Sequence, residues 1–235
     1  MAPEHRAAEH RAFEQVNGKV VTARVAPGRE VLARRGAMLA YTGDVSFSPV
    51  HLGPGGAGGA LGRMVAGEQV PMMAAQGTGT VHYGYRGLYL TVIELDGTGP
   101  LSVEADRLVA HDAALQSTVA FLGRQGLGSQ GAIRGAVRGA VSGQGLFTTQ
   151  LHGHGSAAVL SHGGTIAIPI GGSPSHPGPV TVDPQAYVAH VGQVSVDVSA
   201  SVSWRDAVGR SSGEAVQLKL TGQGTVYVQA SEQKP

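Results

Sequence analysis

The feature that most constrains the fold is a stretch that the chain repeats. GPLSVEADRLVAH at residues 99–111 recurs, without a gap, as GPVTVDPQAYVAH at residues 178–190. A weaker copy, APGREVLARRGAM at residues 26–38, places Arg34 in the position of His111. A chain that repeats itself in this way is typical of one structural unit used several times.

A second anchor follows each copy in the same order. It reads GTGTV from Gly77, GHGSA from Gly153 and GQGTV from Gly222. Two anchors in a constant order predict a triplicated β unit closed around a pseudo-threefold axis. The expected boundaries are a flexible tail at 1–15 and a single domain at 16–231, with repeats at about 16–96, 97–173 and 174–231.

Alternating hydrophobicity indicates that the units are strands. VSVDVSASVSW at 194–204 puts Val, Ala and Trp on one side and Ser and Asp on the other. A period of two residues with one apolar face is typical of a half-buried strand. VQLKL at 216–220 and TIAIPI at 165–170 alternate in the same way. With glycine-rich turns between such segments, the sequence predicts an all-β sandwich or barrel.

Composition excludes several classes of protein. Apolar residues make up 42% of the 235 residues, so a core can form, and 37 glycines without a Gly-X-Y period exclude collagen. The absence of cysteine excludes disulfides, thiol catalysis and thiolate metal sites. A net charge of +1 gives little attraction to nucleic acid. The charged start MAPEHRAAEHRAFEQ lacks a signal-peptide core, so we expect a cytoplasmic protein.

Two glycine-rich segments resist assignment. Residues 55–68 and 131–143 occupy the same place in the first and second copies, and in the latter a glycine recurs every four residues. Helix, strand and loop all remain possible from periodicity, and our interpretation is a mobile loop with a short helical turn. Arg63, Arg134 and Arg138 make these segments a candidate interaction loop for a partner or a membrane surface.

Several stretches together resemble a known family. They are VLARRGAMLAYTGDVSF from Val31, GRMVAGE from Gly62, GQGLFTTQLHGHGSAAVL from Gly143, VDPQAYVAH from Val182 and LTGQGTVYVQA from Leu220. In order and spacing they resemble the Altered Inheritance of Mitochondria family numbered twenty-four, a mitochondrial biogenesis family listed as a domain of unknown function and widespread in bacteria.

The resemblance covers about residues 16–231, and this chain looks like a bacterial member. It implies a double-stranded β-helix-like fold of three repeats, similar to the tryptophan RNA-binding attenuation protein. The fungal member of the family is associated with the mitochondrial inner membrane. The resemblance implies a fold and no catalytic or binding site.

Histidines offer one candidate metal site. His152 and His154 form an H-x-H, which on a strand would place both imidazoles on one face, and His162 could join them on a divalent metal ion. No acidic residue follows the pair, so the cupin pattern fails. Thr78 and Gln223 stand in the position of His154 in the other copies. The persistent glycines therefore favour a turn with unusual backbone angles as the alternative.

A second candidate is a ring of His111, His190 and Arg34 around the axis, suited to an anion. The alternative is histidines at strand ends, hydrogen-bonded to the backbone. No acid, base and nucleophile come together in the sequence, and no cofactor is predicted.

We therefore expect a non-catalytic interaction or scaffold protein with a protein partner, as a monomer or as a homo-oligomer formed through edge strands. The first alternative is a small-ligand or metal-binding protein, or an enzyme, using the His-x-His strand. The second is a peripheral membrane-surface protein acting through the glycine-rich loops.

Overall fold

The computed structural model describes residues 12–50, 71–121, 147–171, 178–199 and 217–232, and these residues are almost entirely β-structure. The predicted all-β class is therefore confirmed. The elements are β1 (Phe13–Asn17), β2 (Val20–Val25), β3 (Val31–Arg34), β4 (Met38–Pro49), β5 (Met72–Tyr83), β6 (Tyr89–Asp96), β7 (Leu101–Glu104), the 3-10 turn η1 (Ala105–Arg107), β8 (Leu108–Asp112), β9 (Gln116–Phe121), β10 (Phe147–His152), β11 (His154–Ser161), β12 (Thr165–Ile170), β13 (Val180–Val182), β14 (Tyr187–Ser199) and β15 (Gln217–Gln229).

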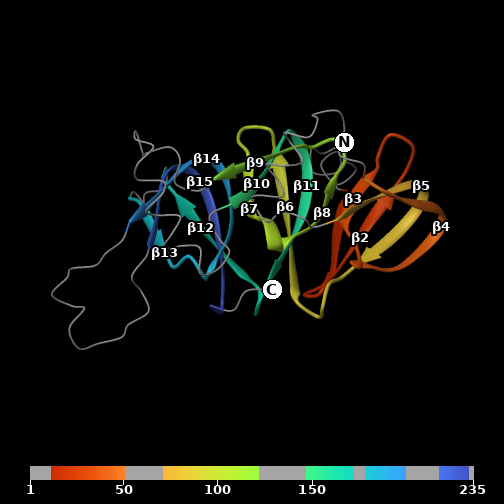
Figure 1. Ribbon diagram of the computed structural model, residues 1–235, viewed down its shortest axis with the longest axis horizontal. Coiled ribbons are helices and arrows are strands. Elements are labelled where there is room, and N and C mark those ends of the chain that lie inside the picture. Colours follow the sequence, from red (N-terminus) through yellow and green to blue (C-terminus); the bar gives the residue numbers. More distant parts are fainter. Residues whose placement is uncertain (1–11, 51–70, 122–146, 172–177, 200–216, 233–235) are drawn as a thin grey trace, which may run out of the picture.

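The strands form two antiparallel sheets (Figure 1). An eight-stranded sheet has the order β1-β2-β5-β3-β8-β11-β6, with β4 also paired to β5. A seven-stranded sheet has the order β12-β15-β14-β7-β10-β9, with β13 also paired to β15. The backbone N–H of Leu90 in β6 donates to the carbonyl of Gly18 at 2.8 Å, which brings the two ends of the first sheet together. That sheet is therefore a nearly closed barrel. Among the described residues, no helix is long and apolar enough to cross a membrane.

The β domain begins earlier in the chain than expected. Phe13 pairs with Ala23 in the β1–β2 hairpin and is only 2% exposed. Residues 13–15, which were expected in a flexible tail, thus belong to the sheet. The reason is tertiary: the single apolar side chain of this segment enters the core, while the neighbouring residues of β1 stay exposed.

The strand pairings fall into three groups with matching registers. The first group is β1–β5, the second is β6–β11 with η1, and the third is β12–β15. In each group the last long segment pairs with the other strands of that group along its two edges, except that β1, among the described strands, pairs only with β2. These long segments are β5, β10 with β11, and β15. These groups place β6 and β12 at the start of the second and third groups, whereas the expected boundaries had left them in the preceding repeat.

The three anchor glycines lie at corresponding points of these long segments. Gly77, Gly153 and Gly222 have φ of +114°, +119° and +111°, a region that residues with a side chain rarely adopt. These φ values are the unusual backbone angles that the persistent glycines of this motif predicted.

A second glycine lies two residues after the anchor glycine and allows the paired strands to approach closely. Gly224 of β15 faces Gly192 of β14, and a Cβ on Gly224 would collide with the carbonyl oxygen of Val191. A Cβ on Gly79 of β5 would likewise collide with the carbonyl oxygen of Thr42.

The core consists of three apolar clusters of Val, Leu, Ile, Ala and a few aromatic residues, and each cluster lies mainly under one group. Residues of the second group enter the first cluster, and Val188 and Ala189 of the third group enter the second cluster. The groups are therefore joined by shared packing as well as by strand pairing.

Candidate functional site

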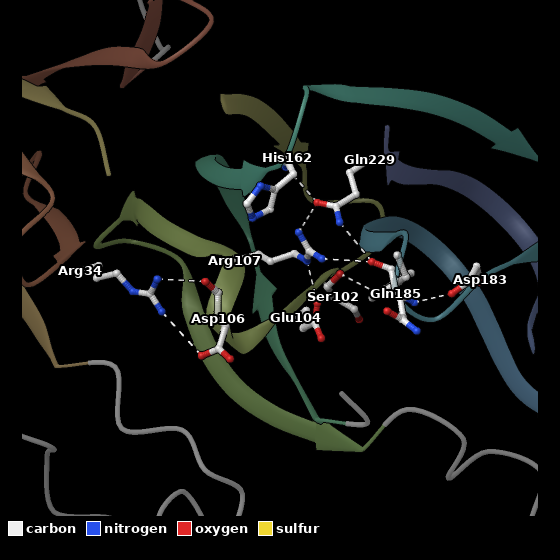
Figure 2. A network of polar contacts seen from close by, with 10 residues as sticks. Arg34, Ser102, Glu104, Asp106, Arg107, His162, Asp183, Gln185 and Gln229 are labelled. Carbon is white, nitrogen blue, oxygen red and sulfur yellow. Dashed lines mark hydrogen bonds and ion pairs between the residues drawn. The ribbon is translucent and has the colours of Figure 1, made fainter. Parts of the chain in front are cut away.

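A buried arginine lies where the second group meets the third (Figure 2). Arg107, at the end of η1, has no exposed surface. Its Nε donates to Glu104 Oε2 at 2.7 Å, its Nη1 to Gln229 Oε1 at 2.6 Å and its Nη2 to the carbonyl of Gln185 at 3.4 Å. The same Gln229 oxygen accepts the backbone N–H of His162 at 2.9 Å, and Gln229 Nε2 donates to the Gln185 carbonyl at 3.2 Å.

This network joins segments that are far apart in the sequence. Its acceptors come from β7, from the loop before β14 and from β15. Burying a guanidinium is costly unless it is paired and hydrogen-bonded, and here three of its nitrogens have protein acceptors. Arg107 therefore holds the second and third groups in a fixed arrangement.

A buried tyrosine and histidine lie at the same junction. The Tyr187 hydroxyl donates to the carbonyl of Ser102 at 3.1 Å and lies 2.9 Å from His190 Nδ1. Because the hydroxyl hydrogen points to Ser102, Nδ1 carries the hydrogen of the second bond. Burial lowers the pKa of His190 to about 4 and also lowers the pKa of His111. Both imidazoles are therefore neutral near pH 7.

The expected ring of His111, His190 and Arg34 does not form. His111 pairs with Ala157 and His190 with Val226, and the corresponding pair in the first group is Tyr41 with Val81. Tyr41, not Arg34, is thus the counterpart of the two histidines.

Arg34 ends β3 and has a different role. Its Nη1 donates to the carbonyl of Asp106 at 2.9 Å, and its guanidinium lies 4.8 Å from the centre of the Tyr85 ring. It thus bridges the first and second groups. The first copy lacks both the histidine and the Gly-Pro start, which hides this correspondence in the sequence. The similarity of MLAY to LVAH and YVAH is the signal that reveals it.

The H-x-H pair is divided between the two sheets. His152 pairs with Gln116 in the seven-stranded sheet, whereas His154 pairs with Asp96 in the eight-stranded sheet. The bend at Gly153 therefore removes the alternation on which the shared face depended. His162 follows β11, and its backbone N–H bonds to Gln229.

The described residues contain no group of three or more His, Cys, Asp or Glu that could hold a metal ion. A metal site at His152, His154 and His162 stays a prediction. Arg63, Arg134 and Arg138 of the candidate interaction loop lie outside the described residues.

An exposed apolar segment begins β4. Met38, Leu39 and Tyr41, called here the β4 edge, are 42%, 56% and 47% exposed. This half of β4 pairs with β5 on one side, and no other described strand pairs with it. The corresponding strands in the other groups, β8 and the start of β14, are buried and paired on both sides. Sequence alone could not single out this edge because all three segments are equally apolar.

Similarity to known proteins agrees with this architecture. The family described as mitochondrial biogenesis AIM24 matches residues 12–231. The chain belongs to the AIM24 family. No curated protein matches the chain significantly. The crystal structure of protein SPYM3_0169 from Streptococcus pyogenes is similar to the AIM24 fold described here, with a TM-score of 0.65 and 22% sequence identity over 93% of this chain and 92% of that chain. At that identity the likeness concerns the fold alone.

Proposed function

We propose that this AIM24 protein is a non-catalytic scaffold that joins a protein partner by strand addition at the β4 edge. The partner contributes an extended strand, whose main chain bonds to the open side of β4 and whose apolar side chains cover Met38, Leu39 and Tyr41. Such strand addition is a common mode of peptide and protein recognition.

The observation that supports this proposal most directly is the exposure of the β4 edge. Three large apolar side chains lie together on a strand that has an open side within the described part of the chain. Exposed apolar edge strands are hazards that monomeric proteins normally cover or charge, so their persistence favours an interaction surface.

The polar residues support a structural rather than a catalytic role. Arg107 and Glu104 bond to each other in the core, and His190 bonds to Tyr187. Each of these groups lies at a junction between strand groups, where it positions one group against the next. A rigid frame of this kind suits a protein that presents a surface to a partner.

The experiment measures the size of the complex that contains the protein in lysate of its own host. Leu39→Lys should shift the protein to the mass of the free chain, because a charged side chain on the edge opposes strand addition. Val16→Lys is the matched control, since Val16 is 55% exposed on β1, away from this edge. A wild-type protein that already migrates as the free chain would contradict the scaffold role.

A further inference from the structure

We propose that the strand which covers the β4 edge is β13 of a second copy of this chain, so that copies join head to tail. The pairing is antiparallel, with Val180 opposite Thr42, Thr181 opposite Tyr41 and Val182 opposite Ala40. This inference rests on the proposed function, because it names the partner of the same edge.

The register comes from two junctions that the chain already makes. Between the first and second groups, β3 pairs with β8, with Leu32 opposite His111. Between the second and third groups, β7 pairs with β14 in the same register, with Ser102 opposite His190. Each junction thus joins the short strand of one group to the strand that begins the long hairpin of the next.

At the two ends of the chain this junction is left open. β13 is the short strand of the third group, and within the described residues it pairs only with β15. The counterpart of β8 and β14 in the first group is the start of β4. No described strand pair therefore joins the third group to the first, and the expected closure within one chain is not made by strand pairing. In Figure 1, β13 and β4 lie at opposite ends of the long axis.

The exposure of β4 and β13 can be compared with that of their counterparts β8 and β7, which are paired at the junctions within the chain. Leu108 and Val109 belong to β8, which pairs with β3, and they are 6% and 0% exposed, with Val109 in the first core cluster. Their counterparts Met38 and Leu39 on the open β4 edge are 42% and 56% exposed. The same contrast holds at the other end. Ser102 of β7 is buried against β14, whereas its counterpart Thr181 in β13 is exposed. The two surfaces are the separated halves of one kind of junction.

Charge at the end of the short strand fits the same arrangement. Arg34, which ends β3, bonds to Asp106 in the turn that precedes β8. The residue that follows β13 at the corresponding place is Asp183, and the turn that precedes β4 carries the exposed Arg35. Asp183 of one copy thus faces a cation of the next, with the signs exchanged.

The contact is heterologous, because two different surfaces meet. Repeated use of such a contact produces a closed ring or an open filament rather than an isolated two-fold dimer. Each additional copy continues the order of strand groups that already exists within one chain.

The test uses the absence of cysteine from the chain, which leaves only introduced thiols to react. Thr181→Cys and Tyr41→Cys are made in separate proteins, mixed and oxidised. Directly opposed residues of antiparallel strands have the Cα separation that a disulfide needs. We expect a product of twice the 23.9 kDa chain mass from the mixture and none from either variant alone.

Ser48→Cys is the control for register, because Ser48 is exposed on the same strand but roughly 23 Å from Tyr41 at 3.3 Å per residue. Mixed with Thr181→Cys, it should give no product. A product from Tyr41→Cys alone would mean that like edges pair, and no product from the first mixture of folded proteins would mean that β13 is not the partner. Either result overturns the inference.

Light scattering on the purified wild-type chain provides a measurement that needs no substitution. A mass above that of one chain, rising from low to high micromolar concentration and lost in Leu39→Lys, supports head-to-tail pairing. A constant mass of 23.9 kDa overturns it. If that single-chain mass is found while the lysate complex still depends on Leu39, the scaffold role stands and its partner is another protein.

Discussion

Arg107 is a charged residue placed in the interior of a β protein, and its environment explains how this is possible. The side chain is fully buried, and Glu104, its ionic partner, is 5% exposed. Glu104 and Arg107 are three positions apart in the sequence, so the single short turn η1 brings the carboxylate and the guanidinium together. The arrangement binds the second group to the third at the cost of removing two charges from water.

Replacement of Arg107 by Met should lower the free energy of unfolding by about 3–5 kcal/mol, because the buried Glu104 carboxylate then loses its cationic partner. Urea denaturation at pH 7 measures the loss. Addition of Glu104→Gln to this variant should restore part of the stability, since the remaining group is then neutral. A single variant that unfolds at the wild-type urea concentration would show that the pair does not hold the junction.

His190 makes stability depend on pH in a defined direction. Its pKa is about 4 in the folded protein against an ordinary value of 6.5, so the unfolded chain binds the proton more readily. The stability that depends on a neutral His190 is fully present above pH 6.5. As the pH falls toward 4, the free energy of unfolding decreases by about 3 kcal/mol. Tyr187, the bonded neighbour, has its pKa raised well above 10 by burial and stays protonated throughout.

His190→Gln isolates this effect from that of other groups, including His111, whose pKa is also lowered. Between pH 6.5 and 4 the unfolding free energy of this variant should fall less steeply than that of the wild type. Curves that stay parallel over this interval would contradict the assignment.

Among the elements, the close pairing of β14 with β15 depends on the absence of a side chain at Gly224. A Cβ on Gly224 would meet the carbonyl oxygen of Val191 and would lie 2.8 Å from Val194 Cγ2. Gly224→Ala should therefore destabilise the protein by about 1–3 kcal/mol through overpacking. Thermal unfolding provides the measurement, and Gly178→Ala is the control because nothing lies within 4 Å of its added Cβ. Equal melting temperatures for the two variants would refute the close approach.

Strand prediction succeeded where alternation was strong. TIAIPI coincides with β12, and VQLKL begins one residue before β15. Prediction failed at β1, where FEQVN carries few apolar residues and owes its conformation to pairing with β2. The shared strand face expected for the H-x-H motif also does not form, because alternation holds only along an unbroken strand and Gly153 lies where the chain passes from one sheet to the other.

At the scale of the whole molecule, sequence was sufficient for the fold class and insufficient for the candidate site. MLAY, LVAH and YVAH are similar segments, yet only the first is exposed. The difference depends on whether another strand group precedes the segment, which is a property of the assembled chain and not of the segment itself. The Arg107 network likewise joins Glu104 to Gln229, positions whose proximity no local pattern reveals.

The second group is divided between the two sheets: β6, β8 and β11 belong to one, and β7, β9 and β10 to the other. Each sheet is therefore completed by strands from the same stretch of chain, and neither can separate from that stretch without disrupting the other. Packing of the second group therefore stabilises both sheets at the same time. We therefore expect the two described sheets to unfold together, because loss of order in the second group removes strands from both.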